Sequence, residues 1–346
     1  MKAGALQALD VSYCGLDDAS LRDLVVMPLS DYPGLLQSLS VSGNPGRLPA
    51  HILPGLLRYL TEIRDLNLSG SIQAESFIEG SLLPFAALKC MESLEELDIS
   101  GYKVSSQCQL RKFRLTDSFF FQVDEATFLD LERFLEYRSW RFEQGQPLRF
   151  HKLVLNHCRI TGTQAARLFH AIGVDHGMHL HLSGNAIEDG IEDLTAAIRS
   201  DSGPAGLHLE MIEFKHESAY LSLLASLTHA DHLTHLSLAG TGPSPGPCTP
   251  ALLQTLSTFL STNTSITALD LSGFSGKLDD GQLPAGFGAA LAGLATNTTL
   301  THLRIRNQNL HPAAGARMST PFPSSTVHPL VHPIAYPLLF LENHTN

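Results

Sequence analysis

Cysteine, basic side chains and long apolar runs are all scarce in this sequence. It has five cysteines in 346 residues, an odd number, so the composition does not indicate a disulfide framework. Lys and Arg total 23 against 34 Asp and Glu, a net charge of -11, whereas nucleic-acid binding needs a surplus of cations. The apolar stretch 333–341 is interrupted by Pro337 and is too short for a membrane helix. We therefore expect no nucleic-acid partner and no transmembrane segment.

Signals for secretion and for catalysis are missing as well. Residues 1–16 show no basic-then-apolar leader, so we expect a cytoplasmic protein. No His-Glu-x-x-His or Cys-x-x-Cys occurs. Gly273–Lys277 ends in Gly-Lys, but Leu278 follows, and the first glycine stands too close for a phosphate-binding loop. These absences predict a protein that is not an enzyme and has no catalytic residues and no cofactor.

What the sequence has in abundance is one repeated leucine pattern. Leu-x-x-Leu-x-Leu, or a close variant, recurs about ten times, with first positions at residues 6, 36, 63, 94, 150, 177, 204, 233, 266 and 300. All steps but one are 27–34 residues, a period typical of leucine-rich repeats. The apolar residues at positions 4 and 6 of each unit lie two apart, so both point to one face of a short strand. Position 9 falls at Cys14, Asn44, Cys158 and Asn185, where a buried side chain can bond to neighbouring backbone.

Helical spacing follows the strands. Apolar residues at 187, 191, 194 and 198 are spaced 4, 3 and 4 apart, and Thr249–Pro250 is typical of an N-cap followed by the first helical residue. The sequence thus predicts an α/β fold: a leucine-rich repeat solenoid, or horseshoe, with parallel β-strands on the concave face and helices on the convex face.

The joints between helices and strands carry a family resemblance. Two segments resemble the joints of ribonuclease-inhibitor-like repeats: Ser-Thr-Asn-Thr-Ser-Ile-Thr-Ala-Leu-Asp-Leu-Ser-Gly (261–273) and Ala-Thr-Asn-Thr-Thr-Leu-Thr-His-Leu (295–303). Their repeat pattern is similar to that of the leucine-rich domain of the CARMIL family. That resemblance implies a protein-interaction scaffold of the actin-regulating type. The lipid-binding and capping-protein-binding segments of that family have no counterpart here, so its capping activity does not carry over. Two alternatives are a regulator of a small GTPase, similar to Ran GTPase-activating proteins, and a substrate-recognition repeat domain of a larger protein.

Two regions depart from the regular period. The step of 56 residues between Leu94 and Phe150 is twice 28, so we expect a degenerate unit within 105–149, with a strand at 110–115 and a helix at 124–138. The segment 240–250 contains four prolines and predicts an expanded loop. We therefore expect a solenoid of about 10–11 units over 1–310, followed by an irregular Pro- and His-containing tail at 311–346.

Charged and histidine side chains are expected to project from the concave strands and bind a protein partner. These residues are Asp10, Asp65, Glu96 and Asp98 in the first units and Lys152, His179, His181, His208 and Arg304 in the later ones. An acidic half followed by a mildly basic half would orient a charged partner along the groove of a monomeric scaffold. The alternative is surface variation without function.

Histidine is the one unusually frequent residue, 17 in all. His181 and His208 occupy the same position 5 of successive units, so their Cα atoms should lie about 4.8 Å apart. With His179 two residues back, three imidazoles should converge, and their mutual repulsion should lower their pKa values. We expect no metal here. The less favoured hypothesis is a zinc site, or a pH-sensitive contact, at His179, His181 and His208.

Overall fold

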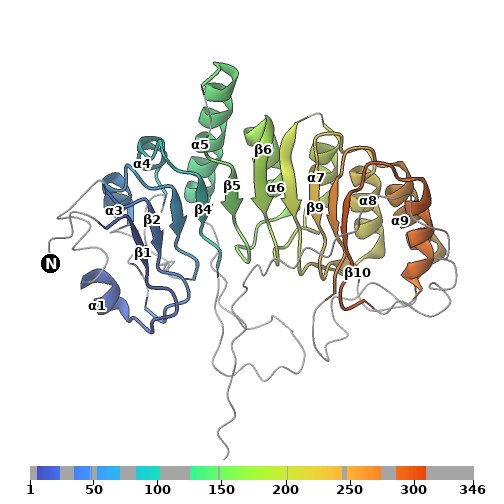
Figure 1. Ribbon diagram of the computed structural model, residues 1–346, viewed down its shortest axis with the longest axis horizontal. Helices are drawn as coiled ribbons and strands as arrows, with labels where there is room; N and C mark the ends of the chain where they lie inside the picture. The colour runs from blue at the N-terminus through green and yellow to red at the C-terminus, as the bar shows by residue number, and fades with distance from the viewer. Residues whose placement is uncertain are drawn as a thin grey trace, which may run out of the picture.

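The computed structural model describes residues 6–23, 35–46, 48, 53–70, 83–101, 125–146, 149–200, 202–243, 248–273 and 286–308. Ten of the described strands form one parallel sheet and follow one another in the order of the chain (Figure 1). They are β1 (Ala8–Asp10), β2 (Ser38–Ser40), β3 (Asp65–Asn67), β4 (Glu96–Asp98), β5 (Lys152–Val154), β6 (Val174–His181), β7 (Gly203–His208), β9 (His235–Ser237), β11 (Ala268–Asp270) and β12 (His302–Arg304). Two further short strands, β8 (Glu213–Phe214) and β10 (Gly242–Pro243), pair in parallel at the rim.

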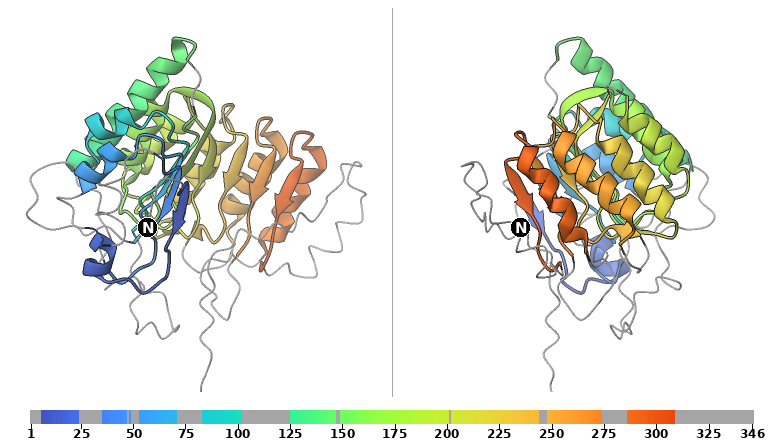
Figure 2. Two further views of the ribbon diagram at one scale, coloured as in Figure 1. Left: turned by 60° about the vertical axis from the view of Figure 1, so that its left-hand side comes forward. Right: turned by 90° about the vertical axis from the view of Figure 1, so that its right-hand side faces the viewer.

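Helices cover one side of this sheet, as the right-hand view of Figure 2 shows. They are α1 (Asp18–Leu21), α3 (Leu53–Tyr59), α4 (Phe85–Cys90), α5 (Glu125–Glu143), α6 (Gly162–Ile172), α7 (Ile191–Ile198), α8 (Glu217–Leu227), α9 (Pro250–Thr262) and the 3₁₀ helix η2 (Phe287–Thr296). Strand, turn and helix thus alternate along a parallel array, which is a leucine-rich repeat solenoid and confirms the predicted fold class.

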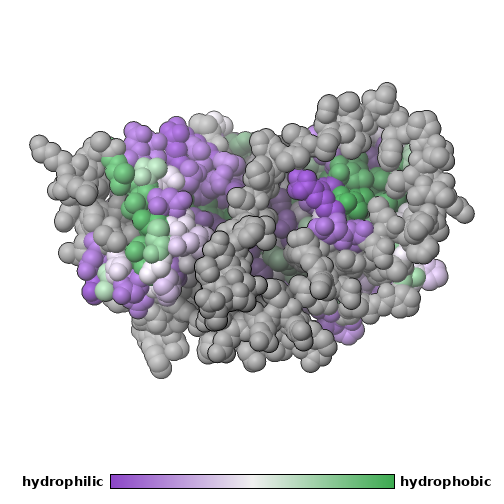
Figure 3. Space-filling model, turned by 60° about the horizontal axis from the view of Figure 1, so that its bottom comes forward, coloured by the Kyte–Doolittle hydropathy of each residue, from purple (hydrophilic) through white to green (hydrophobic). Residues whose placement is uncertain are grey.

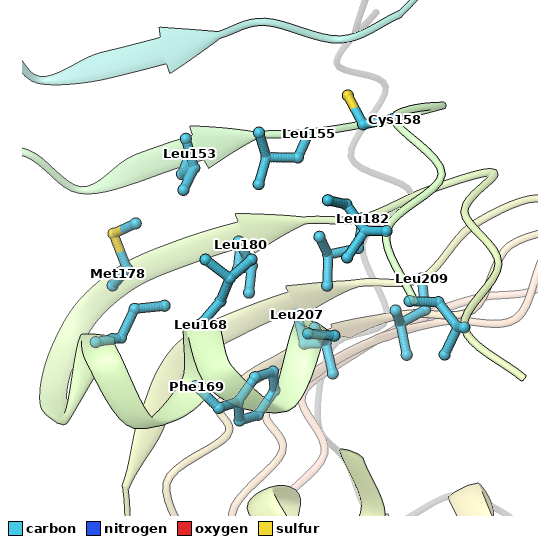
Figure 4. Packing of buried hydrophobic residues seen from close by; sticks show 14 of the residues in the cluster. Leu153, Leu155, Cys158, Leu168, Phe169, Met178, Leu180, Leu182, Leu207 and Leu209 are labelled. Carbon is cyan, nitrogen blue, oxygen red and sulfur yellow. The ribbon is translucent and has the colours of Figure 1, made fainter. Parts of the chain in front are cut away.

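The core lies between the sheet and the helices. The leucine at position 4 of one strand faces the leucine at position 4 of the next, as in Leu66 beside Leu97 and Leu236 beside Leu269. These four side chains are at most 4% exposed, so the face shared by the leucines is the buried one. In Figure 4, leucines of β5, β6 and β7 point toward the helix that carries Phe169. Stacked leucines of this kind bury apolar surface continuously from unit to unit.

The helices begin where the sequence indicates. The Thr249 side chain accepts a hydrogen bond from the Leu252 N–H at the start of α9, and Pro250 occupies the first turn, as predicted. Thr161 and Gln164 form a reciprocal capping box at the start of α6. At the joint after α9, Asn263 Nδ2 donates to the Leu227 carbonyl and Asn263 Oδ1 accepts from the Ile266 N–H. The asparagine of the joint therefore ties the end of one unit to the start of the next.

Position 9 ties neighbouring units in the same way. Asn185 Oδ1 accepts from the N–H groups of Cys158 and Ile160, and its Nδ2 donates to the carbonyls of Leu155 and Leu182. Asn44 and Cys158 are buried as predicted, but Cys14 is exposed, so the prediction was wrong there. A position-9 side chain bonds to the unit before it, and the structure describes no strand ahead of β1.

The prediction of a strand at 110–115 in a degenerate unit was also wrong. β4 pairs directly with β5, with Glu96 opposite Lys152 and Leu97 opposite Leu153, so the sheet has no place between them for a strand from 110–115. Residues 102–124 lie outside the described residues. The helix predicted at 124–138 is present as α5, but it continues to Glu143 and extends past the neighbouring helices in Figure 1. The long step therefore adds no strand to the sheet between β4 and β5. The tail 311–346 and the loop residues 244–247 also lie outside the described residues.

Candidate functional site: the open face of the sheet

Side chains at positions 3 and 5 of each unit stand on the side of the sheet away from the helices, because they alternate with the buried leucines. We call this side the open face; it corresponds to the predicted concave face. In register, position 3 is occupied by Ala8, Ser38, Asp65, Glu96, Lys152, His179, Gly206, His235, Ala268 and His302. Position 5 is occupied by Asp10, Ser40, Asn67, Asp98, Val154, His181, His208, Ser237, Asp270 and Arg304. All nine predicted site residues lie in these two rows.

The acidic part of the open face is centred on β3 and β4. Asp65 is exposed, and its pKa is raised by partial burial and by the nearby charges of Glu96 and Glu95. Glu96 is less free than the sequence suggested, because its carboxylate lies 2.8 Å from Lys152 Nζ and 3.6 Å from His151 Nε2. The boundary between the acidic and basic parts is therefore an ion pair, and Asp65 is the more accessible acid.

Two of the predicted acids also have a structural task. The carboxylates of Asp10 and Asp98 each accept a hydrogen bond from the backbone N–H two residues ahead, at Ser12 and Ser100. Asp270, which the sequence analysis did not select, does the same for Ser272 and also pairs with Arg304 at 3.2 Å. The bonds from Ser12 lower the pKa of Asp10, whereas burial raises the pKa of Asp98. These side chains shape the end of each strand as well as its surface.

The predicted imidazole cluster is present. The rings of His181 and His208 are stacked, with centroids 3.8 Å apart and planes 6° apart, and the ring of His179 lies 5.9 Å from that of His208. The sequence analysis left His235 out of this cluster, yet its ring lies 5.2 Å from His179, although the two residues are two strands apart. Gly206 makes this possible, since a side chain there would begin 2.2 Å from His179 Nδ1.

Burial, more than repulsion, sets the protonation of these rings. The pKa of His179 is lowered to about 4, first by burial and then by the neighbouring imidazoles of His208 and His235. The pKa of His181 is lowered to about 2, again mainly by burial. The predicted direction is therefore confirmed, but mutual repulsion is the smaller cause. Both rings are neutral at pH 7.

The zinc hypothesis finds no geometric support. Within the described residues, no group of three or more His, Cys, Asp or Glu side chains is arranged to hold a metal ion. His181 and His208 stack face to face, so their ring nitrogens do not converge on one point as metal ligation requires. The cluster offers ring faces and hydrogen-bonding edges to a ligand.

Two other features bear on function. None of the described helices is long and apolar enough to cross a membrane. Gly242–Gly246 has the spacing Gly-x-Ser-x-Gly of a nucleophile elbow, which the sequence analysis overlooked, but prolines flank its serine on both sides. Such an elbow follows a buried strand of the main sheet, whereas this segment itself begins with the two-residue strand β10. Ser244 itself lies outside the described residues.

Comparisons with known proteins add little to this geometry. No protein-family model and no curated protein matches the sequence. Among solved structures, the chain resembles the crystal structure of a TLR13–ssRNA13 complex, with a TM-score of 0.34 and 13% sequence identity. The match covers 91% of this chain and 43% of that chain, so this chain spans less than half of its length. The assignment to leucine-rich repeat solenoids rests on the parallel sheet and its register.

Proposed function

We propose that this chain is a non-catalytic scaffold that holds a protein partner against the open face of its sheet. The supporting observation is the pair of in-register rows at positions 3 and 5, which present polar side chains over ten strands while the leucines between them are buried. The polar groups are spread along the array and do not converge on one reacting atom. An extended surface of this kind suits contact with a macromolecule better than enclosure of a small substrate.

The charge distribution on the open face supports an oriented partner. Asp65 on β3 lies near Glu96 on β4 and Glu95 just before it, and four imidazoles gather on β6, β7 and β9. A partner with a cationic segment at one end would bind in one direction across the strands, because the acidic part of the open face repels an acidic segment in the reversed orientation. In Figure 3, hydrophilic residues lie beside hydrophobic ones at both ends of the array, so the described surface is mixed in character.

The identity of the partner follows only from the family resemblance. The resemblance of the repeat sequences to those of the CARMIL family supports a role in regulating the actin cytoskeleton. The alternatives are a small GTPase and, for a piece of a longer protein, a substrate chosen for modification. Quantitative binding of the full chain to actin, to actin capping protein and to a panel of small GTPases separates these classes directly.

The surface itself is tested by charge reversal. Asp65→Lys changes an exposed carboxylate of the open face, and Glu192→Lys is the matched control on the helix side, where Glu192 is exposed on α7. We expect Asp65→Lys to weaken partner binding about tenfold or more while Glu192→Lys leaves it unchanged, with melting temperatures equal to wild type, because exposed charges shift stability by only about 0.5 kcal/mol. Loss of binding in the Glu192 variant alone would place the partner on the helices and overturn the proposal.

A further inference from the structure

Two histidines at the C-terminal end of the open face have the same local setting. His235 and His302 both occupy position 3, each follows a threonine, and each ring is exposed. The Thr234 hydroxyl lies 2.9 Å from His235 Nδ1, and the Thr301 hydroxyl lies 2.9 Å from His302 Nδ1. The segment Leu-Thr-His-Leu therefore builds the same threonine–imidazole contact twice.

The threonines determine which ring nitrogen carries the proton. Thr234 donates its single hydroxyl proton to the Ala205 carbonyl at 3.1 Å, so toward His235 it can only accept. Thr301 does the same, donating to the Thr267 carbonyl at 3.0 Å. Nδ1 of both imidazoles is therefore the protonated nitrogen of the neutral ring. Their Nε2 atoms carry a lone pair and can donate a hydrogen bond only after the ring takes up a second proton.

The neighbouring charges are largely paired with one another, so an anion could pair with the two histidines. The two permanent cations in the position 3 and 5 rows of β5 to β12 are paired, Lys152 with Glu96 at 2.8 Å and Arg304 with Asp270 at 3.2 Å. Glu210 accepts from the Ser237 hydroxyl and lies 3.6 Å from His208 Nδ1. No ion pair between either histidine of the pair and a carboxylate is found among the described residues. The charged and titratable groups of the neighbouring strands are Glu96, Asp98, His151, Lys152, His179, His181, His208, Glu210, Asp270, Arg304 and Arg306.

We propose that His235 and His302 form a proton-coupled docking site for an acidic segment of the partner, whose carboxylates accept hydrogen bonds from the two protonated Nε2 atoms. This proposal rests on the proposed use of the open face for binding and names the partner's chemistry. Affinity rises as the pH falls, because the bound carboxylate stabilises the charged imidazole. His179 and His181 stay neutral beside the site, since burial lowers the pKa of both rings. Burial, and then the charges of His208 and His302, also lower the pKa of His235, so its protonation depends on the bound carboxylate.

The spacing of the pair indicates the shape of the segment. β11 lies between β9 and β12 and carries only Ala268 at position 3, so the Cα atoms of His235 and His302 lie two strand spacings, about 9.6 Å, apart. The ring of His235 leans toward His179, on the side away from His302. A polyproline II helix repeats every three residues, about 9.3 Å. Glutamates at every third residue of such a segment therefore match the spacing of the two backbone positions, and a flexible glutamate side chain can follow the His235 ring. A chain crossing the strands with this period is the form of partner that the site fits.

The test uses two acidic peptides of equal composition on the full chain. Acetyl-(Glu-Pro-Pro)₃-amide places its carboxylates about 9.3 Å apart, and acetyl-Glu-Glu-Glu followed by six prolines and an amide places them together. In calorimetric titrations we expect the first peptide to bind at least about tenfold more tightly at pH 5.5 than at pH 7.5, with proton uptake measured by comparing buffers of different ionisation heat. The second peptide should bind more weakly at both pH values.

Variants separate this site from general charge effects. His235→Gln combined with His302→Gln should remove the pH dependence, while His170→Gln, on the exposed side of α6, should leave it unchanged. Thr234→Val combined with Thr301→Val frees Nε2 to carry the proton, so peptide affinity at pH 7.5 should rise and the pH profile should flatten. Melting curves of each variant check folding.

Three results would overturn the proposal: no heat of binding at pH 5.5, equal binding of the two peptides, or an unchanged pH profile in the double histidine variant. Any of these leaves the wider role of the open face standing if Asp65→Lys still weakens partner binding. If Asp65→Lys left partner binding unchanged while the peptide still bound in a histidine-dependent way, the histidine site would stand and the wider role of the open face would fail.

Discussion

Replacement of Asn185 by alanine should destabilise the middle of the array strongly. Asn185 is buried and makes four hydrogen bonds that join two units: it accepts from Cys158 and Ile160 and donates to Leu155 and Leu182. Alanine leaves two buried N–H groups without their acceptor, at about 1–3 kcal/mol each, so the free energy of unfolding should fall by roughly 2–6 kcal/mol.

The repeat itself supplies the comparison variant. Cys158 occupies the same position one unit earlier and donates to the carbonyls of Asn156 and Ile99. Asn185→Cys keeps a donor and loses the acceptor, so its loss should lie between those of the wild type and of Asn185→Ala. Urea denaturation followed by circular dichroism measures the total effect, and hydrogen exchange locates it. The reasoning would be refuted by a loss below about 1 kcal/mol, or by exchange that rises evenly over all units.

Three further predictions concern single side chains. Leu97→Ala should cost about 2–5 kcal/mol, because it opens a cavity between β3 and β5, and its effect on hydrogen exchange should stay within the adjacent units. The pKa of His179, about 4 in the folded chain against 6.5 as the reference value, means that the unfolded state binds more protons between these values. Its contribution is therefore fully present above pH 6.5 and is lost as the pH falls toward 4, and His179→Gln should flatten that part of a stability–pH profile; an unchanged profile would contradict the assigned pKa. Cys158 should resist alkylation in the folded chain, because burial raises the pKa of its thiol, whereas exposed Cys14 should react quickly; mass spectrometry after brief labelling compares the two.

Most of the fold could be predicted from the periodicity of the sequence, because each unit repeats the same pattern of buried and exposed residues. The leucines at position 4 and the polar residues at positions 3 and 5 follow from a strand period of two, so the sequence could place all nine candidate residues on one face. It could not decide whether 110–115 forms a strand of the sheet, since a short apolar pattern says nothing about which strands pair. β4 and β5 settle that by pairing directly.

The contacts within the candidate site could not be predicted from the sequence, because they depend on how far each side chain extends and in which direction. The contact between His179 and His235 crosses Gly206, and a position number does not tell how far a ring leans over a glycine. Cys14 is likewise exposed although it occupies the same position as buried Cys158, and it belongs to the unit of β1, the first described strand. Glu96 was selected as a partner-binding acid, but it pairs with Lys152, which comes from a strand 56 residues away along the chain. Register made that pairing predictable only once β4 and β5 were known to be neighbours.

The direct pairing of β4 with β5 makes this junction a natural place for inserting a second domain. The step between the two units is 56 residues, about twice the others, yet the register of the sheet is unbroken across it. Doubling the length of a connection adds only about 0.6 kcal/mol to the entropy of closing it. α5 packs against both α4 and α6, so the solenoid is covered on either side of the junction. A reporter domain or a cleavable linker could therefore be spliced into 102–124 while the strands keep their order, which would make the array a carrier for cargo held at a fixed point along its length.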